Sequence, residues 1–456
     1  MKKVNPYPLT VALLLTLVAT LTGASEPVIE PSEKKYSPAL NKNHPGNVYW
    51  GDTHLHTNLS QDISGKSLPP ADAYRFARGD TVTSYTGITM QRQRPLDFLV
   101  IADHAENIGL FPSLNNGNPA LMATEQGRQL REAYQKAKNT SDWADYFWKK
   151  EVVGGKVFKQ SIWSRVGDQA DEYNEPGVFT AFIGYEWTSS AFNLHRVVIF
   201  KDGAEQTKKV LPFSQFDSKK PEDLWQYFSR YEKQTGGEVL AIPHNGNLSA
   251  GHMFGLKDSN GKTLSRDYAQ NRSRWEPLYE VTQIKGDSEA HPFLSPDDIF
   301  SDYETWYPFL EVKPENTRRQ YEYARSALKL GLGQQHKLGV NTFKFGMVGG
   351  SDAHGGISAV EEDNFVGKGY WMEPNPDRIK SPAYGGMNRR AIPGWQLNAA
   401  GYTGIWAREN TRESLFAAMK RKEVYASTGP RMTVRFFGGW DYQSDDAFSS
   451  ELAQIG

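Results

Sequence analysis

The sequence predicts an α/β fold, and a barrel is the arrangement that it favours. Short apolar runs recur along the chain, and most of them end in a polar residue of a type that binds metal ions. Helix-like segments lie between several of these runs. Strands that alternate with helices and close on polar residues are typical of a barrel with its site at the carboxyl ends of the strands. An open doubly wound sheet is the alternative, but no Gly-x-Gly-x-x-Gly fingerprint follows the first strand.

The expected strands are continuous apolar runs, which suit parallel strands covered on both faces. Five of them lead directly to polar residues, at 47–50, 96–102, 179–185, 239–243 and 345–351. Two further candidates are 195–200, which begins with His195, and 278–284, which contains Glu280.

Helices are expected at 124–138, 221–235 and 318–330. Pro221 fits a helix start and Gly236 fits its end. Two stretches interrupt the alternation and are interpreted as insertions. Residues 106–177 are rich in Trp and Tyr and helical in pattern, whereas 250–276 are polar and loop-like. Insertions after barrel strands usually shape the substrate pocket.

The two ends differ from the expected main domain at 46–431. Residues 1–24 combine Lys2 and Lys3 with an uncharged apolar run, the layout of a cleaved secretory signal peptide. An uncleaved anchor is the alternative, but the run is shorter than the roughly 20 residues of a membrane span. Residues 25–45 are a polar leader, so the predicted location is periplasmic or secreted. Residues 432–456 have β character at first and are expected to begin a β-rich C-terminal region, with a truncated chain or an incomplete second domain as the two interpretations.

The composition narrows the classes of function. The formal net charge is −1, so the chain has no electrostatic footprint for a nucleic acid or an anionic membrane. The chain contains no Cys, which rules out disulfides, thiolate metal ligands and a Cys nucleophile. The sequence does not predict an oligomeric state.

The histidines divide into two groups. Four of them lie in loops or a polar helical stretch and are interpreted as ordinary: His44, His252, His291 and His336. The other six lie within or next to expected strands: His54, His56, His104, His195, His244 and His354.

The spacing of the second group favours metal binding. On an extended strand, His54 and His56 point to one face because side chains alternate, and Asp352 with His354 repeats that pattern. A single His is more often structural, but six of them beside Asp62, Glu186 and Asp352 predict a multinuclear site. Imidazole and carboxylate ligands without thiolate suit Zn, Mn or Fe. More ligands than one ion uses imply two or three ions.

The order of these motifs resembles the ligand motifs of the polymerase and histidinol phosphatase (PHP) superfamily. The matching motifs are His54-x-His56, Asp62, Asp103-His104, Glu186 with His195, Pro243-His244 and Asp352-x-His354. More closely, segments 184–188, 349–354 and 424–431 resemble a group of large bacterial PHP-like proteins long labelled as a domain of unknown function. The resemblance covers roughly 46–440.

This resemblance implies a distorted seven-unit (β/α) barrel, PHP-type and TIM-like, with a trinuclear site. His54, His56, Glu186 and Asp352 would hold the first ion. Asp62, His104 and His354 would hold the second. Glu186, His195 and His244 would hold the third, which makes Glu186 a bridge. Asp62 lies in a loop, and His195 opens its expected strand instead of ending it.

The predicted function is an exported metal-dependent phosphoesterase that cleaves phosphate monoesters or diesters with a metal-activated water. Asp352 or Glu186 would orient the water. Arg196, Arg412 and Arg431 are candidates for binding the substrate's oxygens, because a guanidinium matches phosphate bidentately. Arg431 is preferred, because the turn before it resembles the family's site-proximal loop.

Two alternatives remain open. One is hydrolysis of sulfate or phosphonate esters, and the other is a non-catalytic, metal-stabilised binding module whose aromatic-rich insertion recognises a polymer. The expected partner is a small-molecule or polymer-borne ester, and no membrane anchor is expected after signal cleavage.

Overall fold

The computed structural model describes residues 45–449 apart from 138–140, 152–154, 190–191, 307–315, 379, 381 and 385–391. The expected signal peptide and all but the last residue of the expected leader lie outside this range. Residues 44–456 form one unit by their contacts. None of the described helices is both long enough and apolar enough to cross a membrane.

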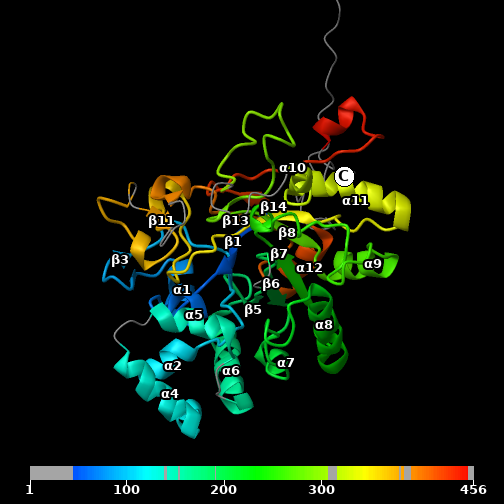
Figure 1. Cartoon of the computed structure of the whole chain (residues 1–456). Coiled ribbons are helices and arrows are strands. Elements are labelled where there is room, and N and C mark those ends of the chain that lie inside the picture. The colour runs from blue at the N-terminus through cyan, green and yellow to red at the C-terminus, as the bar shows by residue number, and fades with distance from the viewer. Residues whose placement is uncertain are drawn as a thin grey trace, which may run out of the picture. The chain divides into compact units, whose positions relative to one another are not determined.

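A curled, seven-stranded mixed sheet forms the centre of the molecule (Figure 1), in the order β14-β13-β1-β4-β5-β6-β7. β1, β4 and β5 are parallel, whereas β6 and β13 run antiparallel to both of their neighbours. The strands are β1 (Asn47–Leu55), β4 (Phe98–Ile101), β5 (Thr180–Trp187), β6 (Arg196–Phe200), β7 (Val239–Pro243), β13 (Tyr402–Ala407) and β14 (Val424–Ser427).

A second, three-stranded sheet continues the curl. Its order is β10-β8-β9, with β8 (Leu278–Gln283) parallel to β10 (Gly346–Gly349) and antiparallel to β9 (Gly286–Asp287). β8 lies beside β7, and β10 lies beside β14, so the two sheets surround a common interior. Two small ribbons pair β2 (Val82–Thr83) with β3 (Thr89–Met90), and β11 (Pro382–Tyr384) with β12 (Ile392–Pro393).

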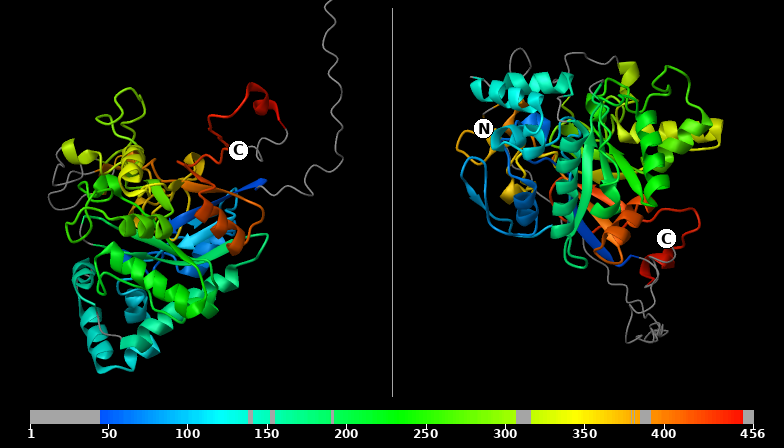
Figure 2. Two further views of the ribbon diagram at one scale, coloured as in Figure 1. Left: turned by 90° about the vertical axis from the view of Figure 1, so that its right-hand side faces the viewer. Right: turned by 90° about the horizontal axis from the view of Figure 1, so that it is seen from below.

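Helices cover the outside of the curled sheet (Figure 2). On this outer side α6 packs on β5, and α8 and α9 pack on β7. In contrast, α12 packs mainly on β13, and its Leu415 and Phe416 lie in the same apolar cluster as the inward-facing Ile199 of β6. The described helices are α1 (Pro70–Ala77), α2 (Leu110–Asn116), α3 (Pro119–Met122), α4 (Glu125–Lys136), α5 (Ser141–Lys149), α6 (Gly155–Tyr173), α7 (Ala204–Thr207), α8 (Pro221–Thr235), α9 (Arg266–Trp275), α10 (Asn316–Arg319), α11 (Ala324–Leu338) and α12 (Arg412–Arg421).

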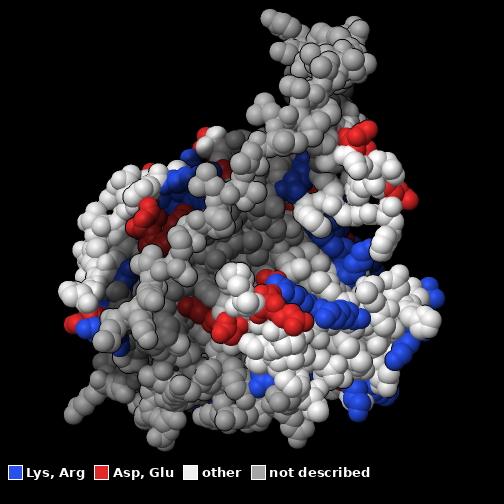
Figure 3. Space-filling view, turned by 90° about the horizontal axis from the view of Figure 1, so that it is seen from above, with Lys and Arg blue, Asp and Glu red and all other residues white. Residues whose placement is uncertain are grey.

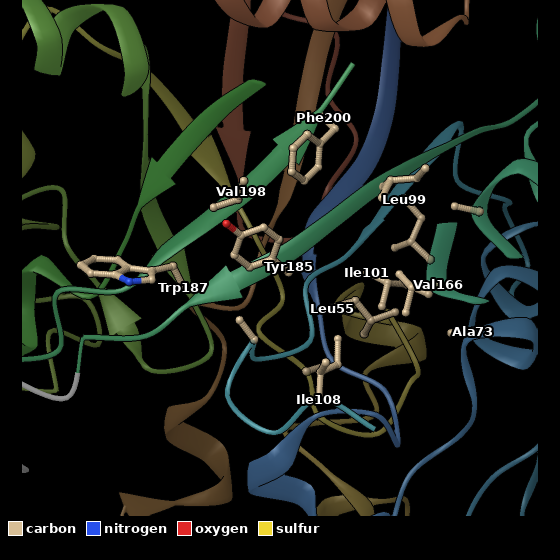
Figure 4. Packing of buried hydrophobic residues seen from close by; sticks show 14 of the residues in the cluster. Leu55, Ala73, Leu99, Ile101, Ile108, Val166, Tyr185, Trp187, Val198 and Phe200 are labelled. Atoms are coloured by element: carbon tan, nitrogen blue, oxygen red, sulfur yellow. The ribbon is translucent and has the colours of Figure 1, made fainter. Parts of the chain in front are cut away.

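The buried apolar residues form an inner and an outer layer because side chains alternate along each strand. The outer layer lies between sheet and helices, and Figure 4 shows Tyr185, Val198 and Phe200 of β5 and β6 within it. The inner layer fills the interior with the alternate residues, such as Phe182 and Ile199. A polar residue at the end of a strand, in register with these inward-facing apolar residues, therefore also faces the interior of the curled sheet.

The strand predictions agree with the structure, but the expectation of parallel strands holds only in part. The expected strand at 195–200 is β6, which is antiparallel to β5 and β7. Its first residues therefore lie at the edge where the parallel strands end. This direction explains why His195 opens its strand while the other ligand candidates close theirs. The finer expectation of seven strand–helix units stays a prediction.

Three predictions about the other segments differ in detail from the structure. The expected helix at 318–330 is α11, which starts at Ala324 after the extended Tyr323 and continues to Gly339, a left-handed cap. The expected loop at 250–276 contains α9, which Ser265 caps by accepting a hydrogen bond from the Tyr268 amide. The described residues from 432 to 449 contain no strand. There, the Val434 backbone binds the side chains of Tyr425 and Trp406 instead of a neighbouring strand.

Candidate metal centre

The end of β1 presents two imidazoles to one another. The pairing of β1 with β4 is irregular between Asp52 and Leu55. The Nε2 atoms of His54 and His56 lie 3.1 Å apart, and both residues are fully buried. Asp52 fixes this geometry, because its carboxylate accepts hydrogen bonds from the amides of His54 and Ser351.

Glu186 lies at the centre of the cluster, on the inner face of β5. Its Oε1 atom lies 2.7 Å from His195 Nδ1 and 2.9 Å from His244 Nε2. Its Oε2 atom lies 3.1 Å from His56 Nε2 and 3.3 Å from His104 Nδ1. One carboxylate thus faces imidazoles from four different segments of the chain.

Asp352 follows β10 and pairs with two lysines on the other side of the cluster. Its Oδ1 atom lies 3.4 Å from His56 Nε2 and 2.8 Å from Lys368 Nζ. Its Oδ2 atom lies 2.5 Å from Lys285 Nζ. Asp352 has a φ of +48°, a left-handed conformation that is uncommon for a residue with a side chain. Such conformations concentrate at functional sites.

Asp62, His104 and His354 form the outer part of the cluster. Asp62 Oδ2 contacts His354 Nε2 and lies 3.5 Å from His104 Nε2. The Asp62 side chain is 22% exposed and that of His195 is 13% exposed, whereas Glu186 and Asp352 are sealed from solvent. Among the nine residues, access from solvent is therefore greatest at Asp62 and His195.

Three groups of side chains in the described part of the chain have ligand atoms within 4.8 Å of one another. They are His54, His56 and Asp352; His54, Glu186 and His244; and His56, Asp62, His104 and His354. The structure thus brings together eight of the nine predicted ligands. His195 belongs to none of the three groups, although it contacts Glu186. The resemblance implied that His195 joins Glu186 and His244 in one ligand set. In the structure, His54 joins these two residues instead.

Side chains behind the cluster orient its imidazoles. His54 Nδ1 lies 3.1 Å from both carboxylate oxygens of Glu280 on β8, and Glu280 is fully buried. His56 Nδ1 pairs with the Ser60 hydroxyl at 2.9 Å, and His104 Nδ1 pairs with the Thr188 hydroxyl at 2.6 Å. A partner on Nδ1 fixes the ring and turns Nε2 toward the cluster, as in many metal sites.

The pKa values of several side chains in the cluster are shifted in the direction that favours metal binding. Burial raises the pKa of Glu186, but the neighbouring His104 and His244 outweigh burial and hold it well below its usual value. Burial and the charge of His54 lower the pKa of His244 to about 3, and burial lowers the pKa of His354 to about 3. Ionised carboxylates and neutral imidazoles carry the lone pairs that metal ions need.

His104 differs from these two histidines. Burial lowers its pKa, but the carboxylates of Glu186 and Asp62 outweigh burial and raise it to about 9. A ligand imidazole must be deprotonated, so a cation that binds at His104 displaces a proton.

The residues fit divalent cations. Glu186 Oε2 and His244 Nδ1 are buried without a hydrogen bond in the described structure, which is costly for polar atoms. The donors are imidazole nitrogens and carboxylate oxygens, which bind Zn and similar ions at about 2.0–2.2 Å. Two ligand atoms on one such ion lie at most about 4.4 Å apart. In the group of His54, His56 and Asp352, the ligand atoms lie 3.1 Å, 3.4 Å and 3.6 Å apart, within this limit.

A family model described as "Protein of unknown function (DUF3604)" matches residues 43–456. The chain belongs to this family. No curated protein matches the DUF3604 chain.

One similar solved structure is a two-domain protein from Bacteroides vulgatus, described as containing a predicted PHP-like metal-dependent phosphoesterase. It is 12% identical, with a TM-score of 0.34, over 85% of this chain and 69% of that one. Membership of DUF3604 agrees with the predicted group labelled as a domain of unknown function, and the link to the PHP superfamily stays a prediction.

The three arginines predicted to bind substrate lie elsewhere in this DUF3604 protein. Arg196 follows His195 on β6 and therefore points to the opposite face, where its Nε donates to Glu276 at 3.0 Å. Arg412 at the start of α12 binds Asp171 and the Ala181 carbonyl oxygen. In both cases the guanidinium stabilises the packing of the fold rather than facing the cluster.

Arg431 also lies away from the cluster. Its guanidinium binds Glu361 and the carbonyl oxygens of Arg94 and Pro95. With Arg94 and Glu361 it lines a cavity of about 780 Å³ that none of the nine predicted ligands lines. The structure places the Arg431 guanidinium on Glu361 rather than at the cluster, and its binding of substrate oxygens stays a prediction.

Sequence reasoning missed the cations that do lie at the cluster, Lys285 and Lys368. Lys285 directly follows an expected strand that contains Glu280, and this position was a usable signal. Lys368 lies in a loop without a strand before it, so the sequence offered no comparable signal. Figure 3 shows acidic and basic side chains beside one another on the described part of one face of the DUF3604 protein.

Proposed function

We propose that this protein is an exported metal-dependent hydrolase that cleaves phosphate monoesters or diesters at a di- or trinuclear site. The observation that carries the proposal is a buried cluster of imidazoles and carboxylates in which three potential ligand groups are joined through the shared residues His54 and His56. The order of the ligand motifs, which resembles that of the PHP superfamily, supports the same reaction.

Each group of ligands would hold a different metal ion. His54, His56 and Asp352 would hold one ion, and Asp62, His104 and His354, with His56, would hold a second. Glu186, with His54 and His244, offers a third position. When bound, divalent ions supply an activated water and neutralise the charge of a phosphoryl group.

The chain itself contributes orientation and an entrance. Glu280, Ser60 and Thr188 hold the rings of three histidines, so that the ligands are preorganised before substrate arrives. Asp62 and His195 are the more exposed members of the cluster, and we place the entrance beside them. A water oriented by Asp352 or Glu186 would attack from the buried side.

The test uses residues 25–456, purified with added Mn or Zn. We expect bound metal by elemental analysis and cleavage of an aryl phosphate. His54→Ala and Asp352→Ala should lose at least about a hundredfold in kcat/KM, because each removes a ligand that fixes the reacting groups. His336→Ala, at an exposed position of α11, is the matched control and should behave as wild type.

Two results would count against the proposal. Absence of bound metal together with wild-type behaviour of both variants would refute the enzyme. Faster cleavage of sulfate or phosphonate esters than of phosphate esters would keep the site and change its substrate. N-terminal sequencing of exported protein tests the cleavage before Ser25.

A further inference from the structure

Two lysines share one carboxylate at the edge of the cluster. Lys285 Nζ lies 2.5 Å from Asp352 Oδ2, and Lys368 Nζ lies 2.8 Å from Asp352 Oδ1. One carboxylate charge thus stands between two ammonium charges. A buried or half-buried cation is costly unless it is paired, and each of these ammonium groups is paired with Asp352.

The two lysines differ in exposure. The Lys368 side chain is 1% exposed, and its ammonium also donates to the Asp352 carbonyl oxygen at 2.6 Å and lies 3.5 Å from His354 Nε2. This ammonium is fixed from several sides, so Lys368 positions Asp352. The Lys285 side chain is 15% exposed and therefore reaches solvent.

The backbone of Lys285 is held rigidly at the edge of the site. Ile284 and Lys285 form the two-residue loop between β8 and β9, in which Gln283 pairs with Gly286. The Asn247 side chain binds the Lys285 carbonyl oxygen at 3.1 Å. Gly286 has a φ of +106°, and a Cβ there would overlap Trp306 and the Glu304 carbonyl oxygen. The loop therefore presents the Lys285 backbone in one place, with the side chain directed to Asp352.

We propose that Lys285 binds a terminal phosphoryl oxygen of the substrate, and that the site therefore prefers phosphate monoesters to diesters. This inference rests on the proposed function. A diester has two non-bridging oxygens that share one charge, whereas a monoester has three and carries up to two charges. The third oxygen needs a donor besides the ions, and an ammonium with three N–H groups provides it.

The experiment compares Lys285→Gln with wild type, Lys285→Arg and the exposed control Lys337→Gln. Metal content is measured first, then calorimetric binding of inorganic phosphate to the metal-loaded protein, and then kcat/KM for phenyl phosphate and methyl phenyl phosphate. In Lys285→Gln we expect unchanged metal content and phosphate binding weakened about tenfold or more, the size of a lost charge-assisted hydrogen bond. Monoester kcat/KM should fall similarly, diester kcat/KM less than about threefold, and Lys285→Arg should recover most of both losses.

The outcomes separate this inference from the proposed function. Equal losses for both esters, loss of metal in Lys285→Gln, or unchanged phosphate affinity would each overturn the role of Lys285, even if wild type is an active phosphoesterase. If wild type cleaves neither ester, the proposed function fails. Weakened phosphate binding in Lys285→Gln would then still support Lys285 as the anion-binding residue, and unchanged binding would overturn it.

Discussion

Glu280 shows how much of the centre depends on residues that need not touch a metal ion. It lies on β8 in the second sheet and holds His54 Nδ1 from behind. Gly350 allows this contact, because a Cβ there would overlap both the Glu280 carboxylate and His54. The carboxylate makes the imidazole more basic and fixes its direction.

We therefore expect Glu280→Gln to weaken metal binding about tenfold, because the amide keeps the shape but loses the charge. Competition with a coloured chelator measures the affinity. Glu409→Gln, at an exposed position, is the control. An unchanged affinity in Glu280→Gln would show that His54 needs no carboxylate behind it.

Glu322 should make the stability depend on pH. Burial raises its pKa from the ordinary 4.5 to about 7, although Arg319 opposes the shift. Below pH 4.5 the carboxyl is protonated in both states, so its contribution to folding is most favourable there. Between pH 4.5 and 7 the unfolded chain ionises first, and stability falls as the pH rises.

Glu322→Gln removes this loss. We expect the variant to be more stable than wild type at pH 8, by on the order of 1 kcal/mol, and nearly equal near pH 4.5. Urea denaturation at the two pH values measures the difference. Glu362→Gln, which is exposed, should show no such dependence. A gain for Glu322→Gln that is the same at both pH values would contradict the assignment.

Residue types and spacing were enough to find the ligand candidates, but not the partners of the arginines. His54, His56 and Asp352 follow apolar strands, and such positions converge at one edge of a sheet whatever the details of packing. The partner of Arg196 is Glu276, far along the chain, and no local pattern encodes that contact. Substrate-facing and structural arginines therefore look alike in a single sequence.

At the scale of elements, hydrophobic runs located the strands but did not reveal their directions. β6 has the same apolar character as its parallel neighbours, because a buried central strand needs apolar residues in either direction. The place of His195 at the start of its strand was the visible sign of reversal. α11 was misplaced for another reason, since Gly331 and Gly333 lie inside the helix and resemble an end.

The cap of α12 gives a test of local structure. The Thr411 hydroxyl oxygen accepts a hydrogen bond from the Ser414 amide at 3.2 Å, at the start of a helix that packs on β13. Thr411→Ala should lower the free energy of unfolding by about 1 kcal/mol, because a helix amide loses its acceptor. Thr411→Ser keeps the oxygen and should lose less. Equal losses in both variants, measured by urea denaturation, would point to packing instead.

At the scale of the whole molecule, the candidate centre joins distant elements. Its ligands come from β1, β5 and the segments after β4, β7 and β10, so bound ions would hold both sheets together. A ligand at a hundred times its dissociation constant stabilises the native state by about 2.7 kcal/mol. We expect chelation with EDTA to lower the midpoint of thermal unfolding by several degrees, and added Mn or Zn to restore it.

His54→Ala provides the comparison for that experiment. With one central ligand removed, its midpoint should respond much less to EDTA than that of wild type. An equal response in both proteins would place the stabilising ions outside the cluster. Differential scanning calorimetry with and without chelator measures both midpoints.

The direction of β6 also has a consequence for how the chain folds. Glu186 and His195 are only 9 residues apart, across neighbouring antiparallel strands. Ser351 and Asp52, whose contact joins the last ligand segment to the first, are 299 residues apart. Local pairings form early, in about 1–10 μs for a hairpin, whereas distant ones carry the entropy of closing a long loop. The centre should therefore assemble in stages, with Glu186 and His195 in contact well before His54 and Asp352 meet.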